Sequence, residues 1–441
     1  MNAITENTVH TVRTAQNDVF SRFAAFTAAT ELIGAGLYPY FLPLDGHEGT
    51  TVRRAGRELI MCGSNNYLGL TADPRVRAAA RDALDAYGTS CTGSRFLNGN
   101  IDLHHQLEEE LARFLGKPAA LVMSTGYQTN LGVLTALLTP RDYVLIDKDA
   151  HASLVDGCRL SGAKVRRVPH NDPAALAQAL ERLPDHAPRL VVVDGVYSME
   201  GDVCDLPAIS AVCRRYGARL VVDDAHGLGV LADGRGTAAH FGLTDQVDLI
   251  TVTFSKSLAS LGGAVAGSEE AIHYLKHHAR SLMFSAAMTP ADTAAALAAL
   301  RVLRSEPELV VSLQANADYV RRGLAQAGVQ TGHSTTPIIP VPTAGAMETL
   351  AAYHRLIERG VYVNPVLPPA ASPRLRTSFM ASHTVDQLDR VIEAFAAEAD
   401  LVRPRECVSG PADAWHCPPG LEEEPSYAPT VDHRLRHLLE R

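Results

Sequence analysis

Lys256 occupies an unusual setting in the segment TVTFSKSLASLGGAVAG. It follows a β-branched run, lies between two serines, and precedes a Gly-Gly pair that lets the backbone approach a ligand closely. Taken alone, a lysine at the end of a strand is usually a solvated surface charge. A desolvated lysine, however, is unprotonated and can attack a carbonyl, and the hydroxyls of Thr253, Ser255 and Ser257 suit a neighbouring phosphate. The segment therefore suggests imine chemistry on a phosphorylated aldehyde.

Two aspartates and a histidine end another apolar run, LVVDDAHGLG. One interpretation makes Asp223, Asp224 and His226 the ligands of a metal ion. In the other, Asp223 lies beside a heteroaromatic nitrogen and keeps it protonated, as an electron-sink cofactor requires. His226 would then reach a ring hydroxyl or the substrate, or it would be structural. The second interpretation is favoured because an aspartate and Lys256 would hold one cofactor from two ends.

The segment MSTGYQTNLGVL has the order strand, Ser-Thr-Gly-Tyr turn, helix. Free N–H groups at the start of a helix attract an anion, so the turn is a candidate phosphate site. An ordinary helix N-terminus is the alternative. Neither the GxGxxG nor the GxxxxGK[ST] fingerprint is present in the segment, so it does not indicate a dinucleotide or a P-loop nucleotide.

Two further polar residues follow apolar runs. His151 comes after DKDA, where an imidazole can lie against an aromatic ring and donate to a carbonyl. Ser198, in VVVDGVYSMEGD, can hydrogen-bond a ring oxygen. Each could equally be a residue of a strand end that binds no ligand. Together with Lys256 and Asp223, these residues predict pyridoxal phosphate as the cofactor, with no metal.

The elements that must position these residues alternate along the chain. From about residue 56 to 300, short apolar β-rich runs alternate with helical stretches, which predicts an α/β fold with a mainly parallel sheet covered by helices on both faces. Ligands of such sheets bind at the carboxyl ends of the strands. Residues 301–402 predict a smaller α/β domain. Residues 1–55 are expected to form a helical or extended arm, and 403–441 a Pro-rich acidic tail with a short helix at its end.

The composition fits an ordinary globular protein. Hydrophobic residues make up 46% and charged residues 20% of the 441, and the net charge of -9 argues against a nucleic-acid partner. The sequence has neither an apolar run of about 20 residues nor an apolar N-terminal signal, so we expect a cytoplasmic location. Seven scattered cysteines show no zinc-type spacing and are expected to be reduced thiols.

A series of motifs resembles, in order, the α-oxoamine synthases, a family of pyridoxal-phosphate enzymes that includes serine palmitoyltransferase and 8-amino-7-oxononanoate synthase. The resemblance spans about residues 37–401 and is carried by SNNYLGL, YGTSCTGSRFLNG, STGYQTN, HASLVDG, HND, DGVYSMEGD, DDAHGLGV, TFSKS and LRTSFMASHT. It implies a fold-type I transferase, with a mainly parallel seven-stranded-type sheet in the large domain.

The resemblance also assigns roles to the residues that would contact the cofactor. Four of them would be catalytic: the Schiff-base lysine, the aspartate on the pyridine nitrogen, the histidine near the ring oxygen and the histidine stacked on the ring, namely Lys256, Asp223, His226 and His151. Others would hold the phosphate or the ring oxygen: Gly126 and Tyr127 through their backbone, Thr253, Ser255 and Ser198. Ser285, in MFSAAMTP, matches a position that reaches the cofactor of the neighbouring subunit, which implies a homodimer with shared active sites.

For the substrate, the resemblance assigns Arg376 to the carboxylate of the amino acid, a bidentate task that suits a guanidinium, with Arg374 ranked second. Asn65 or Asn66 would line the entry side, and the adjacent asparagines leave the register open.

The implied reaction is a decarboxylative Claisen condensation of an amino acid with an acyl thioester, which gives an α-amino ketone. Lys256 would remove the α-proton, and His151 would guide the thioester carbonyl. The segments TFSKS, GVYVN and LPPA look more like serine palmitoyltransferase-type members, which favours a longer acyl chain. Some such members carry an arginine where this chain has Leu367, so the amino acid and acyl group stay open. The thioester could come from coenzyme A or from an acyl carrier protein docked on the tail.

Three alternatives stay open at this point. The same fold and cofactor support transamination or retro-aldol cleavage. A metal-dependent hydrolase would use the Asp223 cluster. A non-catalytic subunit would keep the fold, although the joint presence of Lys256, Asp223 and His151 argues against it.

Overall fold

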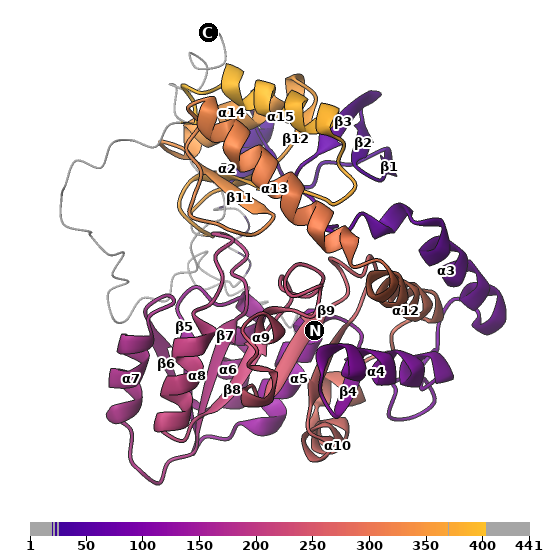
Figure 1. The fold of residues 1–441 in the computed structure, drawn as a ribbon, viewed down its shortest axis with the longest axis vertical. Coiled ribbons are helices and arrows are strands. Elements are labelled where there is room, and N and C mark those ends of the chain that lie inside the picture. Colours follow the sequence, from indigo (N-terminus) through magenta and orange to yellow (C-terminus); the bar gives the residue numbers. More distant parts are fainter. Residues whose placement is uncertain (1–19, 21–22, 24–25, 369, 403–441) are drawn as a thin grey trace, which may run out of the picture.

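A mixed β-sheet lies at the centre of the larger domain (Figure 1). The computed structural model describes residues 20, 23, 26–368 and 370–402, and within them this sheet has seven strands. In their order across the sheet the strands are β4 (Ala119–Met123), β10 (Gly263–Gly267), β9 (Leu249–Thr253), β8 (Arg219–Asp223), β7 (Arg189–Asp194), β5 (Tyr143–Asp147) and β6 (Lys164–Val168). Strand β10 is antiparallel to β4 and β9, and the five strands from β9 to β6 are parallel. The predicted mainly parallel sheet is confirmed.

The sheet is apolar on both faces because helices cover both. Along β7, Val191 and Val193 enter one hydrophobic core, while Leu190 and Val192 enter another on the opposite face. The first core includes side chains of α3 (Pro74–Tyr87), α4 (Asp102–Leu115), α7 (Pro173–Glu181), α8 (Leu206–Arg215), α9 (Thr237–His240) and α12 (Pro290–Ser305). The second includes side chains of α5 (Gly126–Leu137), α6 (Ala152–Ser161), α10 (Glu269–His278) and α11 (Arg280–Met283). Short 3-10 turns occur at Leu70–Ala72 and Thr244–Gln246.

A smaller α/β domain follows, as predicted. Its three-stranded antiparallel sheet has the order β11 (Ile338–Pro342), β14 (Arg374–Ser378), β13 (Asn364–Val366). Pro340 and Pro342 are tolerated because β11 is an edge strand. Helices α14 (Ala346–Glu358) and α15 (Val385–Ala397) pack here. The long helix α13 (Glu308–Gln326) joins the domains, since Leu313 lies in a core of the large domain and Val320 in that of the small one.

The N-terminal segment adds a second small sheet to this domain. Strands β1 (Gly46–Glu48), β2 (Thr51–Arg54) and β3 (Arg57–Met61) form a meander, and β3 pairs in parallel with β12 (Val361–Tyr362). Residues 57–61 fall at the start of the predicted large domain, which runs from about residue 56 to 300. The structure places them with the small domain instead, because Leu59 and Ile60 are buried in its core.

Helix α2 (Ala28–Gly34) lies against the same domain through Leu32, which packs near Leu350 and Leu367. The predicted tail at 403–441, with its terminal helix, and most of the arm before residue 26 lie outside the described residues. Within the described part of the chain, no helix is long and apolar enough to cross a membrane.

Candidate active site

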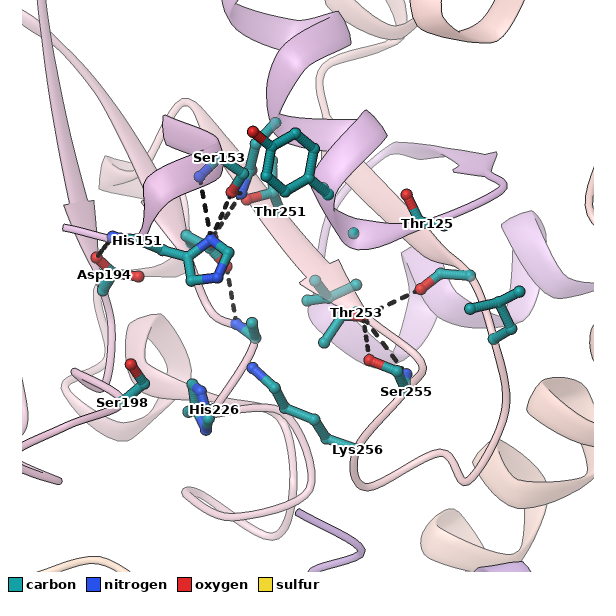
Figure 2. A pocket seen from close by; sticks show the side chains of 18 residues that line it. Thr125, His151, Ser153, Asp194, Ser198, His226, Thr251, Thr253, Ser255 and Lys256 are labelled. Carbon is teal, nitrogen blue, oxygen red and sulfur yellow. Dashed lines mark hydrogen bonds between the residues drawn. The ribbon is translucent and has the colours of Figure 1, made fainter. Parts of the chain in front are cut away.

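A cavity of about 250 Å³ opens at the carboxyl ends of the parallel strands, as expected for this sheet (Figure 2). Strand ends and the first turns of α5 and α6 bring its polar side chains together. Nine of the predicted site residues line the cavity: Gly126, Tyr127, His151, Ser198, Asp223, His226, Thr253, Ser255 and Lys256. Four others, Asn65, Asn66, Ser285 and Arg376, are not part of its wall.

The start of α5 forms one end of the cavity. Thr125 caps the helix by accepting a hydrogen bond from the N–H of Gln128 at 3.0 Å, and the first-turn N–H groups of Gly126 and Tyr127 have no partner within the helix. A Cβ on Gly126 would lie 2.8 Å from Cβ of Thr253, so a side chain at this position would collide with β9. The Oγ atoms of Thr253 and Ser255 lie 2.9 Å apart. These free N–H groups and hydroxyls have the chemistry that a phosphate needs, and the phosphate contact stays a prediction.

Asp223 lies buried at the end of β8. Its carboxylate accepts hydrogen bonds from Nδ2 of Asn130 at 2.6 Å and from the N–H of Ala225 at 3.0 Å. The Oδ1 atom of Asn130 is buried without a hydrogen-bond partner among the described residues. Asn130 lies in the quoted segment STGYQTN, but sequence reasoning gave it no role, because nothing in the linear pattern shows that it reaches β8.

His151 caps α6, and its tautomer can be inferred from its contacts. The N–H of Ser153 donates to Nδ1 at 3.2 Å, and the hydroxyl of Ser153 lies 2.7 Å from the same atom. Burial lowers the pKa of His151, so the ring is neutral and its proton is on Nε2. The backbone N–H of His151 donates to Asp194 at 3.0 Å. Burial, together with nearby Asp223, raises the pKa of Asp194 well above its usual value.

The amino group of Lys256 points into the cavity (Figure 2). Burial lowers its pKa to about 8, and Arg376 acts in the same direction, while Asp223 and Asp194 oppose the change. An ordinary lysine has a pKa near 10.4. A useful share of Lys256 is therefore unprotonated and nucleophilic near neutral pH, as imine formation requires.

His226 is buried and lines the same cavity as Lys256. A hydrogen bond of 2.7 Å joins its Nδ1 to the hydroxyl of Tyr67. Burial lowers the pKa of His226 well below its usual value, and the charges of Lys256 and Arg376 add to this effect. The ring is therefore neutral. Tyr67 is a site residue that sequence analysis missed, although it lies in the quoted segment SNNYLGL.

The alternative metal site at Asp223, Asp224 and His226 is contradicted. Asp224 points away and is fully occupied by Thr237, whose N–H and hydroxyl each donate to it at 2.6 Å. Consecutive residues of an extended segment face opposite sides, so the two aspartates cannot share an ion.

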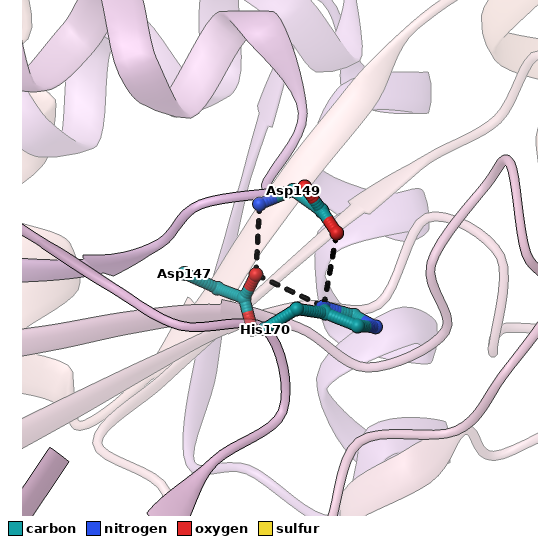
Figure 3. Close-up of side chains that lie close together, drawn as sticks. All are labelled: Asp147, Asp149 and His170. Carbon is teal, nitrogen blue, oxygen red and sulfur yellow. Dashed lines mark hydrogen bonds and ion pairs between the residues drawn. The ribbon is translucent and has the colours of Figure 1, made fainter. Parts of the chain in front are cut away.

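A second cluster of possible metal ligands lies at the end of β5. It consists of Asp147, Asp149 and His170 (Figure 3). Both ring nitrogens of His170 are committed to carboxylates, Nδ1 to Asp147 and Nε2 to Asp202, each at 3.0 Å. Burial by itself would lower the pKa of His170. The hydrogen bonds to the two carboxylates outweigh this effect and raise the pKa to about 10. At neutral pH the ring is an imidazolium without a lone pair for a metal ion.

Arg376 reaches the site from β14 of the small domain. Its Nε donates to the carbonyl of Ser198 at 2.7 Å, and its Nη2 donates to Oδ1 of Asn65 at 3.0 Å. Arg374 instead forms an ion pair with Glu200. The Nη1 of Arg376 donates to Oγ of Ser378 at 3.0 Å. Among the described residues no carboxylate pairs with Arg376, so no ion pair neutralises its charge, and its role toward the substrate stays a prediction.

The two adjacent asparagines, Asn65 and Asn66, have different partners. Asn65 faces Arg376, whereas the buried Asn66 donates to Oγ1 of Thr71 at 2.8 Å and belongs to the local turn. The prediction left this register open, and the geometry favours Asn65. Ser285 accepts a hydrogen bond from the side chain of Gln128 at 2.9 Å, beside the first turn of α5. Its predicted contact with the cofactor of a neighbouring subunit stays a prediction.

Comparison with known proteins agrees with this architecture. A family model described as aminotransferase class I and II matches residues 57–395. Serine palmitoyltransferase from Sphingobacterium spiritivorum is 48% identical over 376 residues, which are 84% of this chain and 94% of that protein. A putative 8-amino-7-oxononanoate synthase 2 from Mycobacterium tuberculosis is 42% identical over 395 residues, which are 88% of this chain and 51% of that protein.

Solved structures show the same likeness. Serine palmitoyltransferase from Sphingomonas wittichii is 36% identical with a TM-score of 0.85, and the match covers 87% of this chain and 99% of that one. A serine palmitoyltransferase from S. paucimobilis, with a bound PLP–myriocin aldimine, is 34% identical with the same TM-score and coverage. The fold and the cavity thus define a pyridoxal-phosphate-dependent transferase of fold type I. More narrowly, the chain belongs to the α-oxoamine synthases, a family of C-acyltransferases.

Pyridoxal phosphate fits the residues of the cavity on three observations. The first turn of α5, where Gly126 has no side chain, and the hydroxyls of Thr253 and Ser255 suit the phosphate. The buried carboxylate of Asp223 suits a protonated pyridine nitrogen. Lys256, with its lowered pKa, suits the aldehyde. When bound, this cofactor withdraws electrons from the α-carbon of an amino acid and so eases the loss of its proton or carboxylate.

Proposed function

We propose that this protein condenses an amino acid with an acyl thioester, releases carbon dioxide and free thiol, and yields an α-amino ketone. The observation that carries the proposal is the position of Arg376, which is unpaired with any described carboxylate and hydrogen-bonded to Ser198 and Asn65 beside the cavity. A guanidinium in this setting suits bidentate binding of the substrate carboxylate. Relatives named serine palmitoyltransferase, 45–48% identical to this chain, support the same reaction.

Three cavity residues have specific tasks in this reaction. Lys256 takes the α-proton of the amino acid, because its lowered pKa leaves it partly unprotonated. Asp223 holds a proton on the cofactor nitrogen. His151, with its proton on Nε2, donates a hydrogen bond to the thioester carbonyl, and its backbone is held by Asp194.

The first substrates to test are L-serine and a long-chain acyl thioester. These two substrates are chosen because the relatives are named serine palmitoyltransferase, and not because of a contact seen in the cavity. Leu367, where some relatives of this type carry an arginine, is buried against Leu32 and Leu350 and offers no charge to a substrate. We therefore expect binding of the amino acid to depend on Arg376 and Asn65 and not on residue 367.

The reaction is tested by product analysis. Purified protein is incubated with L-serine, glycine or L-alanine labelled at the carboxylate, and with an acyl thioester of coenzyme A. We expect labelled carbon dioxide, free thiol and an α-amino ketone in equal amounts. A 2-oxo acid formed without thioester would instead indicate transamination, and an aldehyde with glycine would indicate retro-aldol cleavage.

The partners follow from the same proposal. A homodimer with shared active sites is supported by apolar side chains left exposed near the cavity, where Leu261 is 50% and Phe284 71% accessible. An acyl carrier protein is the second candidate donor, and comparing the rates with the two carriers distinguishes them. Light scattering that shows a monomer in the active sample would contradict the dimer. A cytoplasmic location stays a proposal.

A further inference from the structure

A short hairpin carries Ser198 between β7 and α8. We call residues 196–203 the Ser198 hairpin. It is closed by the pairing of Val196 with Val203 and by a hydrogen bond of 3.0 Å from the N–H of Tyr197 to the carbonyl of Asp202. At its tip Gly201 has φ of +70°, and a Cβ there would lie 2.6 Å from the carbonyl oxygen of Ile338. The hairpin is therefore pressed against the small domain.

The small domain holds the hairpin from one side. Arg376 donates to the carbonyl of Ser198, and Arg374 forms an ion pair with Glu200. The hydroxyls of Ser334 and Thr336 both donate to the carbonyl of Gly201 at 2.9 Å. The carboxylate-binding arginine thus takes its orientation from the backbone of the hairpin.

His170 holds the hairpin from the other side. Its Nδ1 donates to Asp147 at the end of β5, and its Nε2 donates to Asp202 of the hairpin. Its ring packs edge-on against Tyr197, with the centroids 4.4 Å apart, and the hydroxyl of Tyr197 donates to Asp147 at 2.9 Å. Asp147 also accepts the N–H of Asp149 at 2.8 Å, and Asp149 lies two residues before His151 in the chain.

His170 shares its carboxylates with the uncharged Asn171, whose N–H donates to Asp147 at 2.7 Å and whose Nδ2 donates to Asp202 at 3.4 Å, so the positive charge of the cluster comes from His170. It faces three carboxylates, those of Asp147, Asp202 and, at 3.7 Å, Asp149. A charge-assisted hydrogen bond is roughly twice as strong as a neutral one, and here two of them meet on one ring. Without the imidazolium, the carboxylates would repel each other across the base of the hairpin.

We propose that His170 is a positioning residue of the active site, which sets the place of the Ser198 hairpin and, through the carbonyl of Ser198, the orientation of Arg376. His170 does not line the cavity. The proposal deepens the proposed function and rests on it for the role of Arg376. The position of the hairpin itself does not depend on which reaction the protein catalyses.

The test compares His170→Gln and His170→Phe with a matched control. His170→Gln keeps a neutral donor, and His170→Phe keeps the ring contact with Tyr197 and removes both hydrogen bonds. The control is Glu398→Gln, which breaks a buried cluster of similar kind in the small domain, where Glu398 pairs with Arg355 and Arg359. It controls for a general loss of stability.

The first measurement is hydrogen exchange of the holoenzyme, followed in peptides that cover residues 195–204. We expect exchange there to rise about tenfold or more in His170→Phe and less in His170→Gln, with little change in Glu398→Gln. Unchanged exchange in both His170 variants would overturn the proposal. This measurement needs no turnover, so it stands even if the proposed reaction fails.

The second measurement separates KM from kcat. We expect the KM for the amino acid to rise about 5- to 20-fold in His170→Phe, while the KM for the acyl thioester stays within twofold, because Arg376 contacts only the former. A loss of kcat alone, in proportion to the loss in Glu398→Gln, would mean a merely structural role. If His170→Phe does not fold, His170→Gln and the Asp202→Asn variant decide the matter through the same KM ratio.

Discussion

The Nε atom of Arg376 donates a hydrogen bond of 2.7 Å to the carbonyl oxygen of Ser198. These residues are 178 positions apart and lie in different domains. The bond orients the guanidinium beside the cavity while its Nη2 is held by Asn65, and no described carboxylate neutralises it.

Replacing Lys256 with alanine should abolish turnover, with a loss of at least about a thousandfold, because the variant lacks both the imine-forming amine and the base for the α-proton. The protein should still fold, since removal of a buried cationic group leaves the surrounding core intact. Turnover and circular dichroism measure the two effects. Lys276→Ala, on the exposed side of α10, is the control and should keep full activity. Normal turnover in Lys256→Ala would contradict the mechanism.

Replacing Arg376 with alanine should chiefly weaken binding of the amino acid. The loss of a charged hydrogen bond costs about 1.5 to 3 kcal/mol, which corresponds to a rise in KM of roughly 10- to 150-fold. Steady-state kinetics with varied amino acid measures it. Arg376→Lys should recover only part of the loss, because lysine cannot bind a carboxylate in a bidentate manner. An unchanged KM would move the carboxylate site elsewhere.

Capture of the cofactor should speed up as the pH rises through about 8. Lys256 must be unprotonated to attack the aldehyde, and with a pKa of about 8 its neutral fraction goes from about a tenth at pH 7 to about nine tenths at pH 9. The rate of appearance of the imine absorption, after cofactor is mixed with cofactor-free protein, should follow this curve and level off above pH 9. A rate that keeps rising tenfold per pH unit up to pH 10 would show that the lysine is not desolvated.

Replacing Gly126 with alanine should weaken cofactor binding by about tenfold to a hundredfold. The new Cβ would lie 2.8 Å from Cβ of Thr253, so β9 or the first turn of α5 must shift, at a typical cost of about 1 to 3 kcal/mol for overpacking. Equilibrium dialysis of the cofactor gives the affinity. Gly34→Ala, at a helical position with open space around it, should bind the cofactor as the parent does. Equal affinities for the two variants would place the phosphate elsewhere.

Much of the site is already decided by the sequence, and the reason is topological. The runs RLVVVD, RLVVD and LITVT are apolar on both faces, which only a sheet covered on both sides can satisfy. In a parallel sheet the carboxyl ends of neighbouring strands meet at one edge. Asp194, Asp223 and Thr253, which end these runs, therefore had to come together, and the segments after them bring His226 and Lys256 to the same edge.

Choices between similar neighbours were decided only by the tertiary structure. Asn65 rather than Asn66, and Arg376 rather than Arg374, face the site, because their partners Ser198, Glu200 and Thr71 take up specific hydrogen bonds that no spacing encodes. The roles of Asn130 and Tyr67 likewise depend on contacts with residues far away in the chain.

The pairing of β3 with β12 is also decided only by the tertiary structure. About 300 residues separate the two strands, so no local sequence pattern can predict that they pair. Local patterns determine which segments become strands and helices, and therefore which residues reach the edge of the sheet. The orientation of each side chain at that edge depends on long-range packing, and so only the folded structure shows that Arg376 meets Ser198.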